Sequence, residues 1–167
     1  MHGGCPTKEI HMLQVLLKIT GGKFIPEIQV PESITILEVK QQIEVLIKVE
    51  VDRQTLKFNN EELKNDKTIA DYDIKSSADV ALEVTPMPGD PRYDIVVKLS
   101  YQDGPVTVRQ TSLVAEMRAK VARLWGIPLK NTTLKMGSIM IDDDEAPVSA
   151  YYLCPGCVIE AEIKAYR

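Results

Sequence analysis

Cysteine and histidine are scarce in this sequence, and their scarcity excludes several classes of protein. Only three cysteines occur among 167 residues. Cys154 and Cys157 lie too close together to staple a fold, and Cys5 is far from both, so a disulfide framework is excluded. The two histidines, His2 and His11, both lie near the N-terminus. Because no catalytic set, phosphate loop or paired-carboxylate cleft can be assembled, we expect no enzyme activity and no cofactor.

Long hydrophobic runs are also missing. No stretch approaches the roughly 18 apolar residues of a membrane span, and residues 1–12 lack the apolar core of a secretory signal. Apolar residues make up 44% of the chain and charged residues 26%, which is typical of a folded globular protein. We therefore expect a soluble protein of the cytoplasm or the nucleus that does not bind membranes.

An excess of positive charge is missing as well. Residues 12–85 hold 9 Lys and Arg against 13 Asp and Glu, and residues 92–167 hold 10 against 9. Neither part is basic enough for a dedicated nucleic-acid binder. RNA binding by the second part stays an alternative, although no aromatic residues alternate with its candidate basic patch. That patch comprises Arg118, Lys120, Arg123, Lys130 and Lys135.

What the chain does contain is an internal repeat. When the sequence is shifted by 78 residues, Ile36 overlays Val114 and Val39 overlays Met117, together with most other apolar positions. This period is too long for a solenoid unit, so each copy should have its own core. A segment with three prolines separates the copies and predicts a semi-rigid linker. We predict a leader or added segment at residues 1–11, a domain at 12–85, the linker at 86–91 and a second domain at 92–167.

Each copy predicts the same order of elements: a hairpin, one amphipathic helix, and two or three further strands. The first hairpin is expected to turn at Gly21-Gly22, and the second at Asp103-Gly104. The helices are expected over 33–48, with a buried stripe that ends at Leu46, and from Thr111 or Ser112 to Gly126, with a stripe that ends at Leu124. The remaining strands are expected at 55–58, 79–84, 133–136 and 158–164.

Three segments resemble ubiquitin. Gly126-Ile127-Pro128 matches the Gly-Ile-Pro at the end of the ubiquitin helix, and residues 68–74 resemble the segment that leads into its last strand. Leu56-Lys57-Phe58 followed by Leu63 resembles its third strand and the short strand after it. The chain therefore resembles a tandem of two ubiquitin-like domains, an α+β protein with two β-grasp folds.

The resemblance implies either a protein-interaction module or a conjugated modifier. A modifier needs an exposed C-terminal Gly-Gly, whereas this sequence ends in Ile163–Arg167 and the first copy exits through Val84-Thr85-Pro86. We therefore expect a non-conjugated, monomeric adaptor or scaffold with protein partners, among them components of the ubiquitin pathway. A modifier whose Gly-Gly lies outside the given sequence stays an alternative.

The positions that match ubiquitin's apolar recognition patch are mostly charged here. They are Lys57, Ala81 and Glu83 in the first copy and Lys135, Glu160 and Glu162 in the second. Strand alternation turns these side chains outward, where Lys and Glu on adjacent strands can pair. We predict that they form the partner-binding sheet faces with four residues of the first strands: Leu16, Lys18, Val96 and Lys98.

Two further candidates also have an ordinary structural explanation. Trp125 falls outside the predicted apolar stripe of its helix, where it is either an anchor for a partner or packs on neighbouring structure. Cys154 and Cys157 have the spacing of a redox site or half a zinc site, but the Pro-Gly between them also forms turns. We expect a turn at this position and no bound metal.

Overall fold

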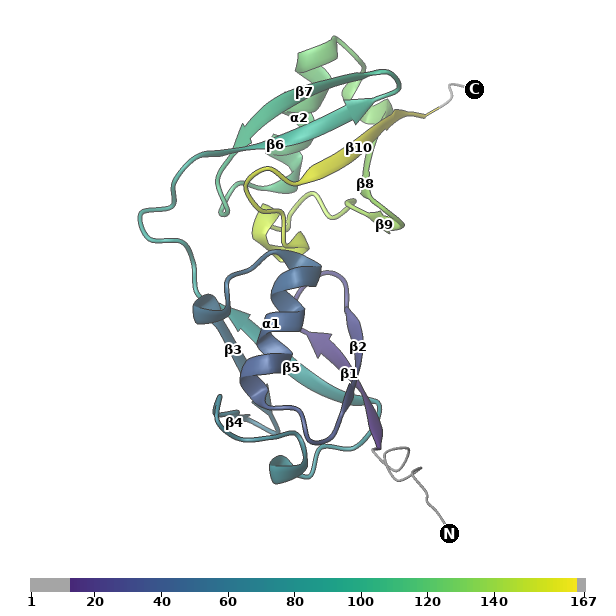
Figure 1. Ribbon diagram of the computed structural model, residues 1–167. Helices are drawn as coiled ribbons and strands as arrows, with labels where there is room; N and C mark the ends of the chain where they lie inside the picture. Colours follow the sequence, from purple (N-terminus) through teal and green to yellow (C-terminus); the bar gives the residue numbers. More distant parts are fainter. Residues whose placement is uncertain (1–12, 165–167) are drawn as a thin grey trace. The chain divides into compact units, whose positions relative to one another are not determined.

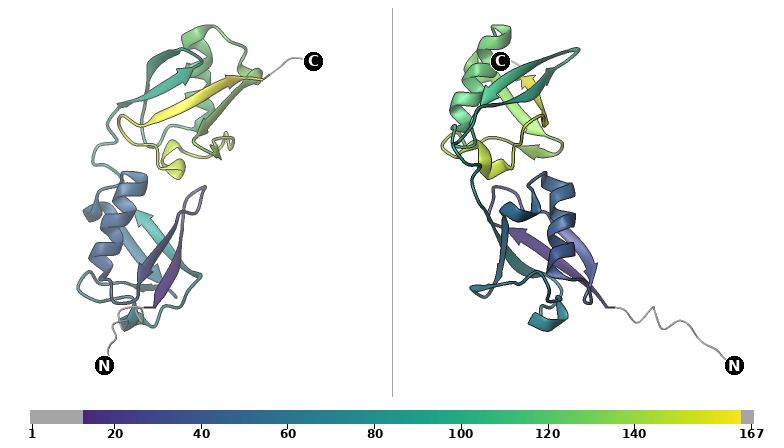
Figure 2. Two further views of the ribbon diagram at one scale, coloured as in Figure 1. Left: turned by 45° about the vertical axis from the view of Figure 1, so that its right-hand side comes forward. Right: turned by 60° about the vertical axis from the view of Figure 1, so that its left-hand side comes forward.

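The computed structural model describes residues 13–164 and divides the chain into two compact units, residues 1–85 and 86–167, called domain 1 and domain 2. The expected leader at residues 1–11 lies outside the described residues. In each domain one helix lies across one face of a mixed sheet (Figure 1) (Figure 2). The predicted tandem α+β architecture is confirmed.

The sheet of domain 1 has the strand order β2-β1-β5-β3-β4. The central strands β1 and β5 are parallel, and every other neighbouring pair is antiparallel. Short 3-10 turns precede β3 and β5. The elements are β1 (Gln14–Thr20), β2 (Glu27–Pro31), α1 (Ile36–Ile47), η2 (Val51–Arg53), β3 (Gln54–Phe58), β4 (Glu61–Glu62), η3 (Ala70–Tyr72) and β5 (Ala78–Val84).

Domain 2 repeats this arrangement with the strand order β7-β6-β10-β8-β9. Its parallel central pair is β6 and β10. The elements are β6 (Tyr93–Leu99), β7 (Gln102–Val108), α2 (Val114–Trp125), η4 (Leu129–Asn131), β8 (Thr132–Met136), β9 (Ile139–Met140), η5 (Val148–Tyr151) and β10 (Val158–Ile163).

The helical stripes that bury the core differ from the predicted ones in their last turn. Leu46 is 53% exposed, and Ile47 is buried in its place. At 3.6 residues per turn, position 47 lies closer than position 46 to the centre of the stripe that Ile36, Val39 and Ile43 form. In domain 2 the same geometry leaves Leu124 exposed.

Trp125 therefore lies on the buried stripe of α2, and the prediction that it falls outside the stripe is wrong. It occupies the position that corresponds to Ile47 and packs, half-buried, against the core of domain 2. An added Cβ at Gly104 of β7 would lie 3.8 Å from the Trp125 ring and 3.1 Å from a methyl group of Leu124. The indole thus contributes to the contact between helix and sheet.

The predicted turn of the second hairpin at Asp103-Gly104 is also wrong. β6 and β7 pair up to Leu99 and Gln102, so Ser100 and Tyr101 form a two-residue turn. Ser100 takes a positive φ of 54°, as two-residue hairpin turns favour. Gly104 instead lies within β7, where its missing side chain makes room for α2.

The two helices begin with different caps. Thr35 caps α1: its Oγ1 accepts a hydrogen bond from the Glu38 N–H, and Glu38 Oε1 accepts one from the Thr35 N–H, each 3.1 Å long. In α2 the predicted caps Thr111 and Ser112 are wrong, because the N-cap position belongs to Leu113. At the other end Gly126 ends α2 in a left-handed conformation, as predicted.

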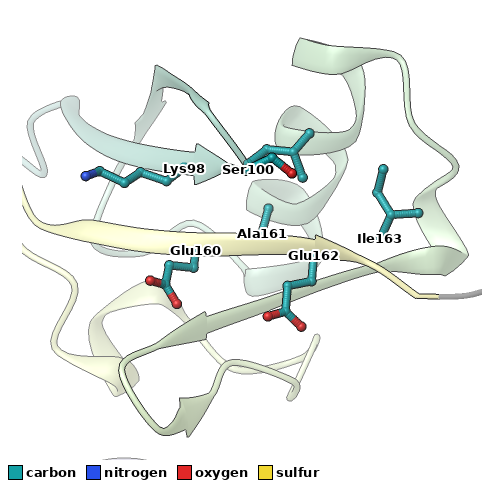
Figure 3. Close-up of a pocket in the computed structure, with 7 residues that line it drawn as sticks. Lys98, Ser100, Glu160, Ala161, Glu162 and Ile163 are labelled. Atoms are coloured by element: carbon teal, nitrogen blue, oxygen red, sulfur yellow. The ribbon is translucent and has the colours of Figure 1, made fainter.

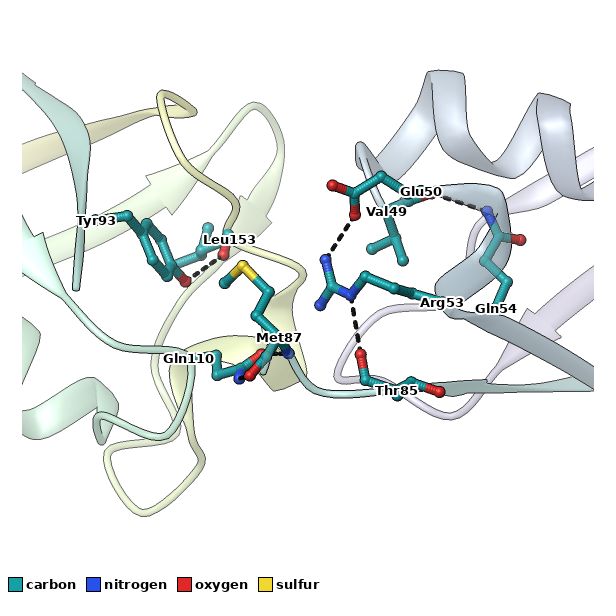
Figure 4. Close-up of polar contacts among 9 residues, drawn as sticks. All are labelled: Val49, Glu50, Arg53, Gln54, Thr85, Met87, Tyr93, Gln110 and Leu153. Atoms are coloured by element: carbon teal, nitrogen blue, oxygen red, sulfur yellow. Dashed lines mark hydrogen bonds and ion pairs between the residues drawn. The ribbon is translucent and has the colours of Figure 1, made fainter. Parts of the chain in front are cut away.

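The proline-rich segment 86–91 is held by domain 2. Gln110 is buried, and its side-chain amide exchanges two 3.0 Å hydrogen bonds with the backbone of Met87 (Figure 4). Farther along, Thr111 donates a hydrogen bond to Asp90. On the domain 1 side, Arg53 Nε donates a 2.9 Å hydrogen bond to the Thr85 carbonyl. The predicted linker is therefore a turn bound to one domain for most of its length.

Candidate interaction faces

The centre of the sheet face in domain 1 is an ion pair. Lys57 on β3 lies opposite Ala81 on β5, and its Nζ is 3.1 Å from Glu83 Oε2. Glu62 on β4 lies opposite Lys57 on its other side. Carboxylates therefore lie on both sides of the lysine, and an apolar ligand placed on it would have to desolvate charges.

A second row on this face is also charged. Lys18 on β1 lies opposite Glu27 on β2 and Asp79 on β5. The row therefore runs acid, base, acid across three strands. Glu27 and Asp79 are exposed, whereas Lys18 is half-buried between them. Their cross-strand positions depend on the register, so the sequence pattern alone did not identify the two carboxylates.

The central row in domain 2 has the same character. Lys98 on β6 lies opposite Glu160 on β10, which lies opposite Lys135 on β8. Lys135 Nζ is 2.8 Å from Glu162 Oε2 and 3.9 Å from Glu160 Oε1. The hydrogen bond to Glu162 raises the pKa of the Lys135 ammonium.

Figure 3 shows Glu160 and Glu162 on one side of β10 and Ala161 on the other, as strand alternation requires. Where β6 and β10 end, a shallow pocket of about 570 Å³ opens beside these carboxylates. Its lining includes Lys98, Ser100 and the half-exposed Ile163. The charged face of domain 2 thus borders a pocket lined by both charged and apolar residues.

The second row of this face is apolar. Val96 on β6 lies opposite Pro105 on β7 and Val158 on β10. Val158 is 47% exposed. These three residues occupy the positions that Lys18, Glu27 and Asp79 hold in domain 1, because the strand registers of the two domains match. The faces therefore share a charged centre and differ beside it.

The same registers show that Leu16 and Val96, the two apolar candidates of the first strands, are not counterparts. Val96 corresponds to Lys18, and the counterpart of Leu16 is Asp94. Leu16 is half-buried, and its backbone N–H donates a 3.0 Å hydrogen bond to Ser76 Oγ. Val96 is half-buried as well, so each first strand offers one apolar side chain on the outer face, at positions that do not correspond.

Cys154 and Cys157 lie in a tight turn. The Cys157 N–H donates a 3.1 Å hydrogen bond to the Cys154 carbonyl, and Gly156 takes a φ of 81°, as type II turns require. The hydrogen bond with the Cys154 thiol, and then burial, raise the pKa of Cys157. Within residues 13–164 no group of three or more potential metal ligands is found.

The candidate basic patch is divided by the fold. Arg118 forms an ion pair with Asp144 and donates a 3.2 Å hydrogen bond to the Thr132 carbonyl. Lys135 belongs to the charged sheet face. Lys120 and Arg123 lie elsewhere, on the side of α2 that faces β7. Arg118, Lys135 and the pair of Lys120 and Arg123 therefore do not form one surface.

No helix in the described part of the chain is long and apolar enough to cross a membrane.

The family model of ubiquitin matches residues 15–86. Among solved structures, this chain is similar to the solution structure of the N-terminal ubiquitin-like domain of the 4931431F19Rik protein, with 18% sequence identity. The similarity has a TM-score of 0.45 and covers 55% of this chain and 95% of that chain. The ubiquitin family model thus matches almost all of domain 1, domain 2 repeats its strand order and helix, and the chain is a tandem of two ubiquitin-like domains.

Proposed function

We propose that this protein is a non-enzymatic adaptor whose two ubiquitin-like domains bind different protein partners. The observation that carries the proposal is the contrast between equivalent rows of the two sheet faces. Domain 1 presents Glu27, Lys18 and Asp79 where domain 2 presents Pro105, Val96 and Val158. A charged row and an apolar row on the same fold favour partners of different chemistry.

The exit of domain 1 supports interaction over conjugation for that domain. Its last strand continues into Thr85, whose N–H and carbonyl are both hydrogen-bonded to Arg53. A modifier's tail must enter the activating enzyme as a free, extended Gly-Gly, which this bound segment does not offer. Because the ubiquitin family model matches domain 1, we propose proteins of the ubiquitin pathway as the first partners to test.

The test uses the full chain with one altered face at a time. Lys18→Glu changes the charged row of domain 1, and Val158→Glu changes the apolar row of domain 2. Lys64→Glu and Leu129→Glu make the same kinds of change at exposed residues outside both rows and are the matched controls. Crosslinking followed by quantitative mass spectrometry should show two different sets of proteins, one lost with each variant. Sequential capture should recover members of both sets on one molecule.

Two results would contradict this proposal. If both variants lost the same proteins, the domains would form one composite binder and not an adaptor. If purified protein formed a thioester with a ubiquitin-activating enzyme, the chain would be a modifier.

A further inference from the structure

A groove of about 690 Å³ lies between α2 and β7, the edge strand of domain 2. The helix contributes Glu116, Lys120 and Arg123, which share one face because they are three or four residues apart. Arg92 and Arg109 come from the segments that flank the hairpin. The lining therefore holds four cations and one carboxylate, although the whole chain has a net charge of −4.

Three of these cations have no side-chain partner in the part of the chain that the structure describes. No hydrogen bond or ion pair joins the side chains of Arg92, Arg109 and Arg123 to another residue of the described range 13–164. The groove's carboxylate is engaged elsewhere, since Glu116 Oε1 accepts a 3.0 Å hydrogen bond from the N–H at the start of its own helix. This contrasts with the sheet faces, where Lys57 and Lys135 are ion-paired with glutamates.

Lys120 has a structural task instead. Its Nζ donates a 2.6 Å hydrogen bond to the Thr107 carbonyl on β7. That bond occupies a backbone acceptor of the edge strand, so a ligand strand could not pair with this carbonyl without displacing the lysine. Recognition in the groove is therefore expected to come from side chains.

Domain 1 shows that the fold does not require these cations. With the 78-residue shift, the counterparts of Arg92, Arg109, Lys120 and Arg123 are Gln14, Pro31, Gln42 and Val45. The counterpart of Glu116 is Glu38, which caps its own helix in the same way. The same structural location is thus neutral in one copy and strongly cationic in the other.

We propose that this groove of domain 2, named the basic groove, binds an extended acidic segment of a partner protein. Guanidinium groups pair with carboxylates through two parallel hydrogen bonds, and Arg92, Arg109 and Arg123 are available for such pairs. The lining contains no aromatic side chain on which bases could stack, which favours an acidic peptide over a nucleic acid. This proposal rests on the adaptor function. It adds a second recognition surface on domain 2 and specifies that the ligand of this surface is an acidic peptide.

The test measures binding of a fluorescein-labelled peptide of alternating Asp and Glu to the full chain by fluorescence anisotropy at about 50 mM salt, where screening is weak. The variant Arg92→Gln/Arg109→Gln/Arg123→Gln keeps Lys120 in place. Three ion pairs of modest strength predict about a tenfold loss of affinity. A peptide with Asn and Gln in place of the acidic residues should not bind.

A matched control removes three exposed cations outside the groove and outside both sheet faces through Lys64→Gln/Lys67→Gln/Lys75→Gln and should keep full affinity. A gain-of-function variant, Gln14→Arg/Gln42→Arg/Val45→Arg, installs exposed cations at the equivalent place in domain 1 and should bind a second peptide. Circular dichroism must show that each variant is folded.

Three outcomes would overturn the basic groove: no peptide binding, an equal loss in the control variant, or tighter binding of a single-stranded oligonucleotide of the same charge. The adaptor proposal fails by a different result. The adaptor proposal is wrong if Lys18→Glu and Val158→Glu lose the same partners, independently of the peptide result. If the two variants lose different partners, the adaptor proposal holds even when the groove binds no peptide.

Discussion

Single lysines decide what the sheet faces can bind. Lys57 and Lys135 stand where ubiquitin presents an apolar side chain, and each is ion-paired with a glutamate on the neighbouring strand. A ligand built for an apolar patch would bury these charges, and each unsatisfied buried polar group costs about 1–3 kcal/mol. The faces of this protein are therefore expected to reject ligands of ubiquitin's patch.

We predict that a ubiquitin-interacting-motif peptide binds the full chain no more tightly than high micromolar. Replacing Lys135→Ile together with Glu162→Val should create an apolar patch on domain 2 and strengthen binding by about tenfold, because two charges no longer need desolvation. NMR titration measures both affinities. Low-micromolar binding to the unaltered chain, with shifts at Lys57 and Lys135, would show that the ion pairs do not prevent recognition.

The cysteine turn gives a second prediction at this scale. Cys157 is half-buried and packs against the core of domain 2, so Cys154→Ser/Cys157→Ser should destabilise that domain by about 1 kcal/mol. Thermal melts measure the change. Elemental analysis of the unaltered protein should find no stoichiometric zinc, since two thiolates supply only half of a tetrahedral site. Zinc at one equivalent that disappears in the double variant would establish a metal site.

The raised pKa of Cys157 predicts slow alkylation. The thiolate is the reactive form, so at pH 8 Cys157 should react with iodoacetamide at least about tenfold more slowly than a free thiol with a pKa near 8.5. Because the folded pKa is raised, its contribution to stability is complete below about pH 8.5 and is lost as the pH rises through the folded value. Mass spectrometry of the alkylated peptide follows the rate. Cys154→Ala removes the hydrogen bond and should accelerate the reaction; no change would mean that burial alone protects the thiol.

Among the elements, the two helices differ most clearly at their first residue. Thr35 and Glu38 complete a capping box on α1, whereas on α2 only the half from Glu116 to the Leu113 N–H is present, because leucine has no acceptor. Leu113 is 41% exposed, so it contributes less burial than a core leucine. The cap of α2 is therefore incomplete.

We predict that Leu113→Thr stabilises domain 2 by about 0.5–1 kcal/mol by supplying the missing side-chain acceptor. Thr35→Leu should destabilise domain 1 by a similar amount, which makes the two substitutions reciprocal controls. Differential scanning calorimetry of the full chain measures both. A loss of stability in Leu113→Thr would mean that the packing of the leucine outweighs the cap.

Periodicity predicted the elements well and their ends poorly. Alternation and the three- and four-residue spacings depend on local geometry, so β1 and the stripe from Ile36 to Ile43 could be read directly. Because a helix has 3.6 residues per turn, its buried stripe shifts by one position in the last turn. The spacing therefore predicts that Leu46 and Leu124 face the core, whereas Ile47 and Trp125 do so in the structure. The Asp103-Gly104 pair looked like a turn, but the packing of α2 on Gly104 overrides that local signal.

The basic groove and the cross-strand rows lay beyond sequence reasoning for a different cause. Arg92, Arg109 and Arg123 are separated by 17 and 14 residues, and only the chain's path brings them to one side of α2. The row of Val96, Pro105 and Val158 depends on register, and a hairpin turn misplaced by three residues changes every cross-strand neighbour.

For the molecule as a whole, the segment between the domains sets how far an adaptor can spread its binding sites. Gln110 binds Met87, and Thr111 binds Asp90, so domain 2 holds the segment 86–91 from its second residue onward. A short free connection raises the effective concentration of the second site for a partner that contacts both domains. We therefore expect Gln110, in addition to the prolines, to limit the conformational freedom of the linker.

We predict that Gln110→Ala releases residues 86–89, which precede the bond between Thr111 and Asp90, while leaving both domains folded, at a cost to domain 2 of about 1–2 kcal/mol for the two lost hydrogen bonds. Spin labels at the exposed positions Ser33→Cys and Ser138→Cys, in a chain without its three native cysteines, report the distance between the domains. The distribution should broaden in Gln110→Ala, because several more residues become free to rotate. Gln41→Ala, an exposed glutamine on α1, is the control and should leave it unchanged. An equally broad distribution before and after the Gln110 substitution would show that the bound turn does not restrict the domains, and that any avidity of the tandem has another origin.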